Sequence, residues 1–231
     1  MGRVNIGIIG AGMMGQEHIQ NFNLLEDARV VALADTSAEM LARAQAMADG
    51  DARISDDFES LLVDPNIDAL VIATPNFHHI DVLAAAIETG KPILCEKPLC
   101  TTLADTQQVV RQVAERGTIF QVGMEYRFKP ALADMIARVD RGDIGVLQML
   151  SIREHRFPFL PKVSDWNRFN ANTGGTLVEK CCHFFDLMRR IIGSEPVSVL
   201  ASAGQNVNHL DERYDGLTPD IWDNGYVVFD F

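Results

Sequence analysis

Three features are scarce in this sequence of 231 residues: cysteine, long apolar runs and positive charge. The four cysteines form neither a C-x-x-C pair nor a spacing typical of zinc ligands, which excludes a disulfide-stapled scaffold and a structural zinc domain. No run of about eighteen apolar residues occurs, so no membrane-spanning helix is predicted. The formal net charge of −12 argues against nucleic acids and anionic membranes as partners.

The N-terminus leads directly into an apolar run, without the basic and then apolar stretch of a secretory signal. With the cysteine spacing, this predicts a cytoplasmic protein whose thiols are reduced and at least half-buried. Neither repeats nor low-complexity tracts interrupt the chain. Its length allows one large domain or two modest ones.

The chain is organised around a glycine-rich turn that follows its first apolar run. Residues 4–9 are apolar and β-branched, which predicts a buried parallel strand. The run leads into a G-x-G-x-x-G motif at Gly10, Gly12 and Gly15, and a helix is expected over residues 16–25. The first glycine permits the tight turn, the second lets a phosphate approach the backbone, and the third lets the helix pack on the strand. This arrangement predicts a dinucleotide-binding site.

Met13, Met14 and Asp35 complete the predicted cofactor site. The two methionines lie inside the turn, where backbone N–H groups and the positive end of the helix dipole attract a pyrophosphate. Asp35 ends a second apolar run, residues 30–34, about twenty residues after the motif, where a carboxylate can hold both hydroxyls of an adenosine ribose. A carboxylate there repels a 2′-phosphate, and residues 36–38 offer no arginine to neutralise it. We therefore expect NAD rather than NADP.

Strand and helix patterns alternate up to about residue 123. Further buried strands are expected over residues 68–73, 92–95 and 119–122, helices over 38–47, 79–88 and 103–116, and an exposed stretch over 54–57 before a short helix near Pro65. This alternation predicts a doubly wound parallel sheet, whose ligands bind beyond the carboxyl ends of the strands. Five polar residues fall at those ends and are candidate cofactor contacts: Asp35, Thr74, Asn76, Glu96 and Lys97.

From about Lys129 the pattern becomes that of a second domain. A helix is expected over 131–141, a strand-like run over 146–156, an irregular segment over 157–173, a helix from Gly174–Gly175 through Arg190, and strands over 197–207 and 221–231. This order predicts an α+β domain with an antiparallel sheet packed on helices. The chain ends within a strand pattern, so the sheet is expected to be incomplete. We therefore expect an NAD-binding domain over 1–123 and a domain for substrate and oligomerisation over 124–231.

Six motifs, in order, resemble those of the glucose–fructose oxidoreductase / inositol dehydrogenase / rhizopine-catabolism (Gfo/Idh/MocA) family. They are Gly10-x-Gly12-x-x-Gly15, Ala73-Thr74-Pro75-Asn76-x-x-His79, Gly90-Lys91-Pro92, Glu96-Lys97-Pro98-Leu99, Gly123-x-x-x-Arg127-Phe128 and Gly174-Gly175-x-x-x-Glu179-x-x-x-His183-x-x-Asp186. The resemblance covers nearly the whole chain. It implies an N-terminal Rossmann domain, a C-terminal domain on an open, mainly antiparallel sheet, and NAD(P)-dependent oxidation or reduction of a sugar, polyol or inositol.

Two departures from the family are visible. Family members continue well beyond this length, and the helix position that usually holds Asp holds Glu179. The resemblance also implies a homo-oligomer, a dimer or tetramer, formed through the C-terminal sheet.

The resemblance assigns further residues to the nicotinamide and the substrate. Three match family positions near the nicotinamide half of the cofactor: Asn76, His79 and Glu96. His79 can equally satisfy the backbone at the start of its helix. Arg127 matches a position that binds substrate or bridges the domains. Trp166 and Arg168 precede the glycine pair, where the family often places cofactor or substrate contacts.

Oxidising a secondary alcohol requires a hydride acceptor, which the cofactor provides, and a group that takes the hydroxyl proton. The candidates are Lys97, His183 and Glu179. A lysine pKa near ~10.4 must fall towards neutrality before the amine can act as a base, whereas a histidine pKa near ~6.5 needs little change. We therefore assign proton transfer to His183 and stabilisation of charge on the substrate oxygen to Lys97. The resemblance leaves open which of the two holds the proton.

Glu179 is assigned to orienting His183 or the substrate hydroxyls. On one continuous helix, Glu179, His183 and Asp186 would share a face. The pair Glu179–His183 lacks a convincingly spaced third ligand, so no metal site is expected.

Three functions remain open at this point. The leading hypothesis is an NAD-dependent dehydrogenase acting on a small sugar, polyol or inositol. An NAD-retaining hydrolase, lyase or epimerase that acts on a sugar by transient oxidation would use the same residues. A non-catalytic NAD sensor is the third, but a sensor needs neither Lys97 nor His183.

Overall fold

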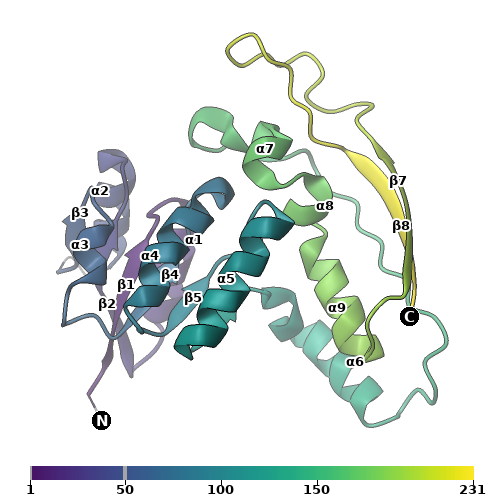
Figure 1. The fold of residues 1–231 in the computed structure, drawn as a ribbon, viewed down its shortest axis with the longest axis horizontal. Helices are drawn as coiled ribbons and strands as arrows, with labels where there is room; N and C mark the ends of the chain where they lie inside the picture. The colour runs from purple at the N-terminus through teal and green to yellow at the C-terminus, as the bar shows by residue number, and fades with distance from the viewer. Residues whose placement is uncertain (1, 49–50) are drawn as a thin grey trace. The chain divides into compact units, whose positions relative to one another are not determined.

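The computed structural model describes residues 2–48 and 51–231. The chain divides into two compact units, Met1–Gly123 and Met124–Phe231 (Figure 1). The first unit holds the glycine-rich turn, and the second holds the segment with Glu179 and His183.

The first unit is built on a six-stranded parallel sheet in the order β3-β2-β1-β4-β5-β6. Its strands are β1 (Val4–Ile9), β2 (Ala28–Ala34), β3 (Arg53–Ser55), β4 (Ala69–Ile72), β5 (Ile93–Cys95) and β6 (Phe120–Val122). The chain order reverses between β1 and β4, and ligands of such sheets bind at the carboxyl ends of the two strands that flank the reversal. The predicted doubly wound sheet is confirmed.

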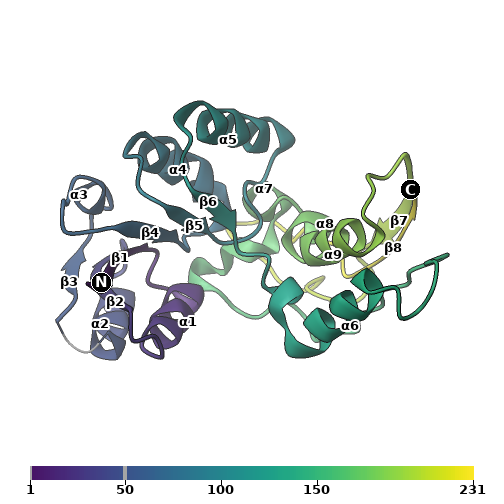
Figure 2. The ribbon, with the colours of Figure 1, turned by 90° about the horizontal axis from the view of Figure 1, so that it is seen from below.

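Helices cover both faces of this sheet, and each face has its own apolar core. Figure 2 shows α1 (Met13–Phe22) and α2 (Ala38–Met47) on one side of the strands, and α3 (Glu59–Leu62), α4 (His79–Glu88) and α5 (Leu103–Arg116) on the other. Ile19 and Leu41 pack with Ile8 and Leu33 on the first face. On the second face, the core includes Ile72, Leu83, Ile87 and Val109.

Most helices and strands of the first unit lie where the sequence predicts them, and the structure differs from the prediction at two places. Ser37 caps α2 as its position predicts, because its hydroxyl accepts a hydrogen bond from Met40 N at 3.3 Å. Helix α1 begins at Met13 rather than at residue 16, so Gly15 lies inside the helix. The stretch expected to be merely exposed near residue 54 forms the short edge strand β3.

The second unit combines short helices with a two-stranded antiparallel sheet, which confirms the predicted α+β class. Its elements are η2 (Glu125–Phe128), α6 (Pro130–Asp140), η3 (Val163–Arg168), α7 (Asn170–Thr173), α8 (Thr176–Glu179), α9 (Cys182–Ile192), β7 (Ser198–Gly204) and β8 (Asn224–Asp230). Strands β7 and β8 pair from Ser198↔Asp230 to Gly204↔Asn224. Buried Ile136, Leu187 and Ile191 join α6 and α9 in one small core.

The prediction of a strand over residues 146–156 is wrong. The structure assigns neither strand nor helix to this stretch. A strand exists only where a neighbour accepts its backbone hydrogen bonds, and a local apolar pattern cannot supply that neighbour. Leu147, Leu150 and Ile152 instead pack against the core between α6 and α9.

The prediction of one continuous helix from the glycine pair through Arg190 is also wrong. Helix α8 ends at Glu179 and α9 begins at Cys182. Apolar residues continue from Leu177 and Val178 into α9, so the sequence pattern alone does not reveal the break.

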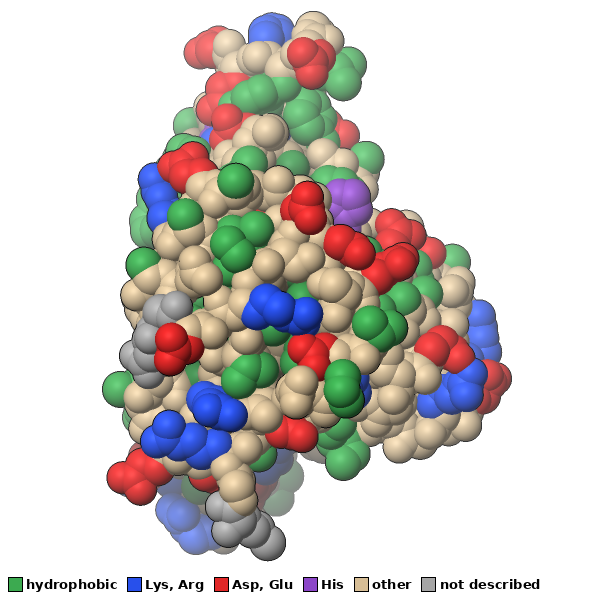
Figure 3. Space-filling view, turned by 90° about the vertical axis from the view of Figure 1, so that its left-hand side faces the viewer, with side chains coloured by type: hydrophobic (Ala, Val, Ile, Leu, Met, Phe, Trp, Pro, Cys, Tyr) green, Lys and Arg blue, Asp and Glu red, His purple; other side chains and the backbone are tan. Residues whose placement is uncertain are grey.

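The described residues also show the state of the thiols and part of the charged surface (Figure 3). None of the helices in the described residues is long and apolar enough to cross a membrane. All four cysteines are free thiols; Cys95 and Cys100 are buried, and Cys181 and Cys182 are half-buried. Burial raises the pKa of the Cys100 thiol to about 11. Figure 3 looks onto the side of Figure 1 on which α2 and β3 lie, and it shows acidic and basic side chains interspersed with other residues.

Candidate active site

Two of the three motif glycines are required by the packing of the protein itself. Gly10 has φ +99°, and a Cβ on it would lie 2.5 Å from the carbonyl of Ala73, just after β4. A Cβ on Gly15 would lie 2.0 Å from Gly10 O. By contrast, a Cβ on Gly12 would meet no protein atom within 4 Å. The packing of the protein therefore does not require a glycine at position 12, and the approach of a dinucleotide phosphate to the backbone there stays a prediction.

The N-terminus of α1 is arranged to receive an anion. Gly12 is the N-cap and offers no side-chain cap, and the first helical hydrogen bond runs from Gln16 N to Gly12 O at 2.9 Å. The N–H groups of Met13 and Met14 precede that bond and lie at the positive end of the helix dipole. This end of the helix thus fits the predicted pyrophosphate.

Asp35 connects the end of β2 to the glycine-rich turn. Its Oδ2 accepts a hydrogen bond from Ala11 N at 2.7 Å, and its Oδ1 accepts one from Ser37 N at 2.8 Å. A carboxylate offers about four acceptor positions, so each oxygen keeps one for a ribose hydroxyl. Two backbone bonds also fix the direction of the carboxylate before any ligand binds.

His79 is fully buried and bridges the loops that follow β4 and β5. Its Nε2 lies 3.0 Å from Thr74 O, and its Nδ1 lies 2.9 Å from Pro98 O and 3.2 Å from Leu99 O. Burial lowers the pKa of His79 although the carbonyls favour its protonated form. Complete burial does not support the prediction that His79 contacts the cofactor directly. The residue instead holds the two loops that carry Thr74 and Lys97.

Glu96 has a partner that the sequence analysis missed. Its Oε1 lies 2.8 Å from Nε2 of His18 in α1, and its Oε2 accepts a hydrogen bond from Lys97 N at 3.2 Å. Burial alone would raise the pKa of Glu96, but the hydrogen bond and charge of His18 and the charge of Lys97 outweigh it and lower the pKa. A signal for His18 existed, because it lies three residues after Gly15 and therefore on the buried face of the helix.

In the second unit, His183 is buried in α9 and is held by the η2 segment. The ring of Tyr126 stacks on the imidazole with centroids 4.1 Å apart and planes 4° apart. Oε1 of Glu125 lies 3.4 Å from Nε2 of His183. An imidazole beside a carboxylate can accept a proton, because the carboxylate stabilises the imidazolium that forms. Glu125 was not among the predicted site residues, since nothing local marks its pairing with a residue so far along the chain.

Arg127 also binds α9, through Asp186. Its guanidinium donates from Nε and a terminal nitrogen to both carboxylate oxygens of Asp186. These hydrogen bonds raise the pKa of Arg127. The bidentate pair fixes η2 against α9 one turn beyond His183. Both residues belong to the second unit, so this pair is not a bridge between the domains. The two roles left open for Arg127, a substrate contact and a bridge between the domains, stay predictions.

Glu179 lies at the end of α8, before the break, so it does not share a continuous helix with His183 and Asp186. Its side chain is buried, and its Oε1 lies 3.6 Å from Nζ of Lys180. The expectation that Glu179 orients His183 stays a prediction. The role of Glu179 towards substrate hydroxyls stays a prediction.

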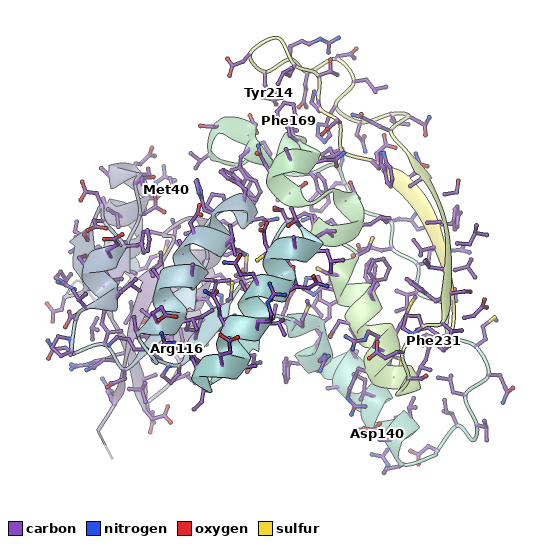
Figure 4. All side chains as sticks on the ribbon, viewed as in Figure 1. Met40, Arg116, Asp140, Phe169, Tyr214 and Phe231 are labelled. Atoms are coloured by element: carbon purple, nitrogen blue, oxygen red, sulfur yellow. The ribbon has the colours of Figure 1, made fainter. Side chains whose placement is uncertain are left out.

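Arg168 is buried and belongs to an ionic network that includes the partly exposed Glu212. Its Nε donates to Oε2 of Glu212 at 2.8 Å, and Glu212 is also bound by His209 at 2.7 Å and by Tyr214 OH at 2.8 Å. Burial would raise the pKa of Glu212, but these hydrogen bonds lower it to about 2. Figure 4 shows Phe169 beside Tyr214, and their rings meet edge to face. A direct substrate contact by Arg168 stays a prediction.

Trp166 lies in η3 next to this network, and its carbonyl accepts a hydrogen bond from Asn172 at 3.0 Å. Asn76 is buried at the start of η1 (Asn76–His78) in the first unit. Both remain predicted contacts. Within residues 2–48 and 51–231, no group of three or more His, Cys, Asp or Glu side chains is placed to hold a metal ion.

Comparison with known families gives a match over almost the entire chain. A model of an oxidoreductase family with an NAD-binding Rossmann fold matches residues 4–124. A model of the same family's C-terminal α/β domain matches residues 136–231.

Relatives and solved structures agree with this match. The chain is 34% identical over 229 residues to inositol 2-dehydrogenase 2 of Saccharopolyspora erythraea, which covers 98% of this chain and 63% of that protein. It is 32% identical over 234 residues to scyllo-inositol 2-dehydrogenase (NAD(+)) of Bacillus subtilis, and the match covers 99% of this chain and 64% of that protein. The structure superposes on the crystal structure of myo-inositol dehydrogenase from Lactobacillus casei in complex with NAD(H) and myo-inositol with a TM-score of 0.76 at 25% identity. The superposition covers 98% of this chain and 63% of that chain.

The chain thus spans less than two thirds of the length of each of these proteins. Within that span, both family models, the parallel sheet and the glycine-rich turn agree, which confirms the predicted NAD-binding Rossmann domain. The chain belongs to the Gfo/Idh/MocA oxidoreductase family.

Proposed function

We propose that this protein is an NAD-dependent oxidoreductase that transfers a hydride between the nicotinamide and a secondary hydroxyl of a sugar, polyol or inositol. The observation that carries the proposal is buried His183 with the Glu125 carboxylate 3.4 Å from its Nε2. A protein that only senses NAD has no use for a proton acceptor of this kind. The names of the relatives, inositol dehydrogenases among them, indicate the substrate class.

His183 takes the proton of the substrate hydroxyl in this proposal. The carboxylate of Glu125 stabilises the imidazolium, and the stacked ring of Tyr126 keeps the imidazole in one orientation. When bound, NAD supplies the hydride acceptor. Lys97 provides a positive charge for the oxygen that loses its proton. Glu179 orients either His183 or the hydroxyls of the substrate.

The cofactor is NAD rather than NADP. The Asp35 carboxylate lies at the end of β2 and is held in place by Ala11 N and Ser37 N. It can bind the two ribose hydroxyls but repels a 2′-phosphate.

The proposal includes the functional division of the chain and its assembly. Residues 1–123 bind NAD, and residues 124–231 bind substrate and join copies of the chain. Strands β7 and β8 leave large apolar side chains exposed, which is typical of surfaces that bind another protein. They are Val199, Leu200, Tyr226 and Val228. The free cysteines and the raised pKa of Cys100 suit a cytoplasmic protein.

The test is turnover of NAD with a panel of inositols, hexoses and amino sugars, followed by NADH absorbance. The variants Lys97→Met and His183→Asn should each lose most activity, while their affinity for NADH, measured by fluorescence titration, stays close to that of the wild type. Near-normal turnover by either variant overturns the role of that residue. Substrate conversion without net NADH identifies instead the transient-oxidation hydrolase, lyase or epimerase.

A further inference from the structure

A histidine on the cofactor-binding helix contacts the carboxylate next to Lys97. His18 lies in α1, on the face that also carries buried Gly15 and Ile19. Its Nε2 is 2.8 Å from Oε1 of Glu96. The two side chains are 15% and 10% exposed. The pair therefore joins α1, whose N-terminus fits the pyrophosphate, to the loop that follows β5.

Glu96 is held on its other sides as well. Its second carboxylate oxygen accepts the backbone N–H of Lys97 at 3.2 Å. A Cβ on Gly123, just after β6, would lie 3.2 Å from Oε1, so the carboxylate fills the space that this glycine leaves. A buried carboxylate with fixed donors on both oxygens is a rigid support for the residue bonded to it.

Attraction between Glu96 and Lys97 gives the support an electrostatic component. The charge of Lys97 contributes to the lowered pKa of Glu96, after the hydrogen bond and charge of His18. The Glu96 carboxylate thus acts on the lysine in two ways, through the backbone N–H and through the ammonium charge. His18 is the side chain that keeps this carboxylate in place.

We propose that His18 is a positioning residue for Lys97, because it holds the Glu96 carboxylate against the lysine and ties that lysine to the helix that binds the cofactor. The inference rests on the proposed function, in which Lys97 stabilises charge on the substrate oxygen. His18 touches neither the substrate nor the reacting atoms in this role. A displacement of about 1 Å at a reacting centre can cost about 100-fold in rate.

The first test separates turnover from binding. We expect His18→Ala to lower kcat by about 10- to 100-fold while the KM for substrate and the Kd for NADH stay within about twofold. His18→Gln keeps an N–H donor that can reach Glu96, so it should recover most of the lost kcat. Gln20→Ala removes an exposed side chain from the same helix and should match the wild type.

Three results would overturn the inference. The first is a kcat of His18→Ala within about twofold of the wild type. The second is a loss of NADH affinity that accounts for the whole loss of activity, because His18 would then act on cofactor binding. The third is a folded His18→Gln variant as slow as His18→Ala, since a hydrogen bond to Glu96 would then not be the relevant interaction.

A second readout does not depend on knowing the substrate. Acetic anhydride acylates neutral amines, and its reaction with Lys97 can be quantified by peptide mass spectrometry relative to Lys91, whose amine is held by the carbonyls of Asp64 and Ile67. Removing the Glu96 charge favours the neutral amine of Lys97. We expect the labelling of Lys97 in Glu96→Gln to be about threefold that of the wild type. In His18→Ala it should rise by less than this, and in His18→Gln it should be close to the wild-type level.

This labelling order distinguishes the two proposals. If the wild type converts none of the panel substrates but the order holds, the proposed function fails and the positioning of Lys97 by His18 stands. If the wild type is active but His18→Ala labels Lys97 like the wild type, the inference fails and the proposed function stands.

Discussion

Asp35 shows how one side chain can serve both the fold and the choice of cofactor. Each of its oxygens accepts one backbone N–H, from Ala11 and from Ser37, and so the carboxylate is oriented before any ligand arrives. Preorganisation of this kind reduces the entropy lost on binding. The same charge disfavours a 2′-phosphate at this position.

Asp35→Asn removes the charge but retains the size of the side chain. We expect NADH affinity to fall and NADPH affinity to rise by about tenfold each, or ~1.4 kcal/mol. Fluorescence titration with both cofactors measures this, with Asp27→Asn at an exposed position as the control. A wild-type protein that binds NADPH as tightly as NADH would contradict the role given to Asp35.

Glu212 makes the stability of the second unit sensitive to acid. Hydrogen bonds from His209, Tyr214 and Arg168 hold its pKa at about 2, below the usual 4.5 of a glutamate, despite the opposing effect of burial. Because the pKa is lower in the folded state, the ionised network stabilises the fold above pH 4.5, and this contribution is lost as the pH falls towards 2.

Glu212→Gln should therefore unfold at lower urea concentration than the wild type at pH 6, and the difference should shrink as the pH approaches 2. Trp166 and Trp222, the two tryptophans of the chain, both lie in the second unit, so their fluorescence reports its unfolding. Asp211→Asn, at the exposed neighbouring position, is the control. A difference that stays constant across this range would show that ionisation of Glu212 does not stabilise the unit.

At the scale of elements, the turn between β1 and α1 holds two glycines that the packing of the protein requires and one, Gly12, for which we propose a role in cofactor binding. A Cβ at Gly15 would overlap Gly10 O, whereas a Cβ at Gly12 would meet only open space. The φ of Gly12 is −71°, so an alanine there is not strained by its own backbone. The two positions thus provide a matched pair of substitutions.

Gly15→Ala should destabilise the first unit by about 1–3 kcal/mol through overpacking, and Gly12→Ala should leave its stability close to that of the wild type. Gly12→Ala should nevertheless bind NADH at least about tenfold more weakly, because the methyl group occupies the space of the phosphate. Chemical denaturation followed by circular dichroism measures the first effect, and NADH titration the second. Wild-type NADH affinity in Gly12→Ala would place the pyrophosphate elsewhere.

Elements with local signals were predictable from the sequence. Ser37 caps α2 and Thr102 caps α5, and Gly117 ends α5 with φ +65°, each as its residue type favours. The break between α8 and α9 was not predictable, because the apolar pattern continues across it. The prediction of a strand over residues 146–156 was wrong for a different reason. The residue pattern is that of a strand, but no partner strand is paired with it in the described chain.

The candidate site was predictable only where its residues follow from local patterns and from the order of the strands. The residues at the carboxyl ends of the strands follow from the topology once the alternation is recognised. The pairings of His18 with Glu96 and of Glu125 with His183 join residues far apart in the sequence, and only the folded chain brings them together. Complete burial of His79 likewise depends on two loops that close over it.

At the scale of the whole molecule, the proposed reaction needs groups from both units. In that proposal the first unit provides the NAD site and Lys97, and the second provides His183 with its neighbours on η2. The chain spans less than two thirds of the length of the inositol dehydrogenases it resembles. The quantity to measure is therefore hydride transfer by this chain of 231 residues.

The proposed hydride transfer is tested most directly by following a carbon-bound hydrogen of the substrate to the nicotinamide. The protein is incubated with NAD and with myo-inositol, or another active member of the panel, that carries deuterium on its ring carbons, and the NADH formed is analysed by mass spectrometry. We expect the wild type to form NADH that carries one deuterium, and we expect Lys97→Met and His183→Asn to form none. Failure to form deuterated NADH with any member of the panel, although NADH binds, would contradict the proposed hydride transfer.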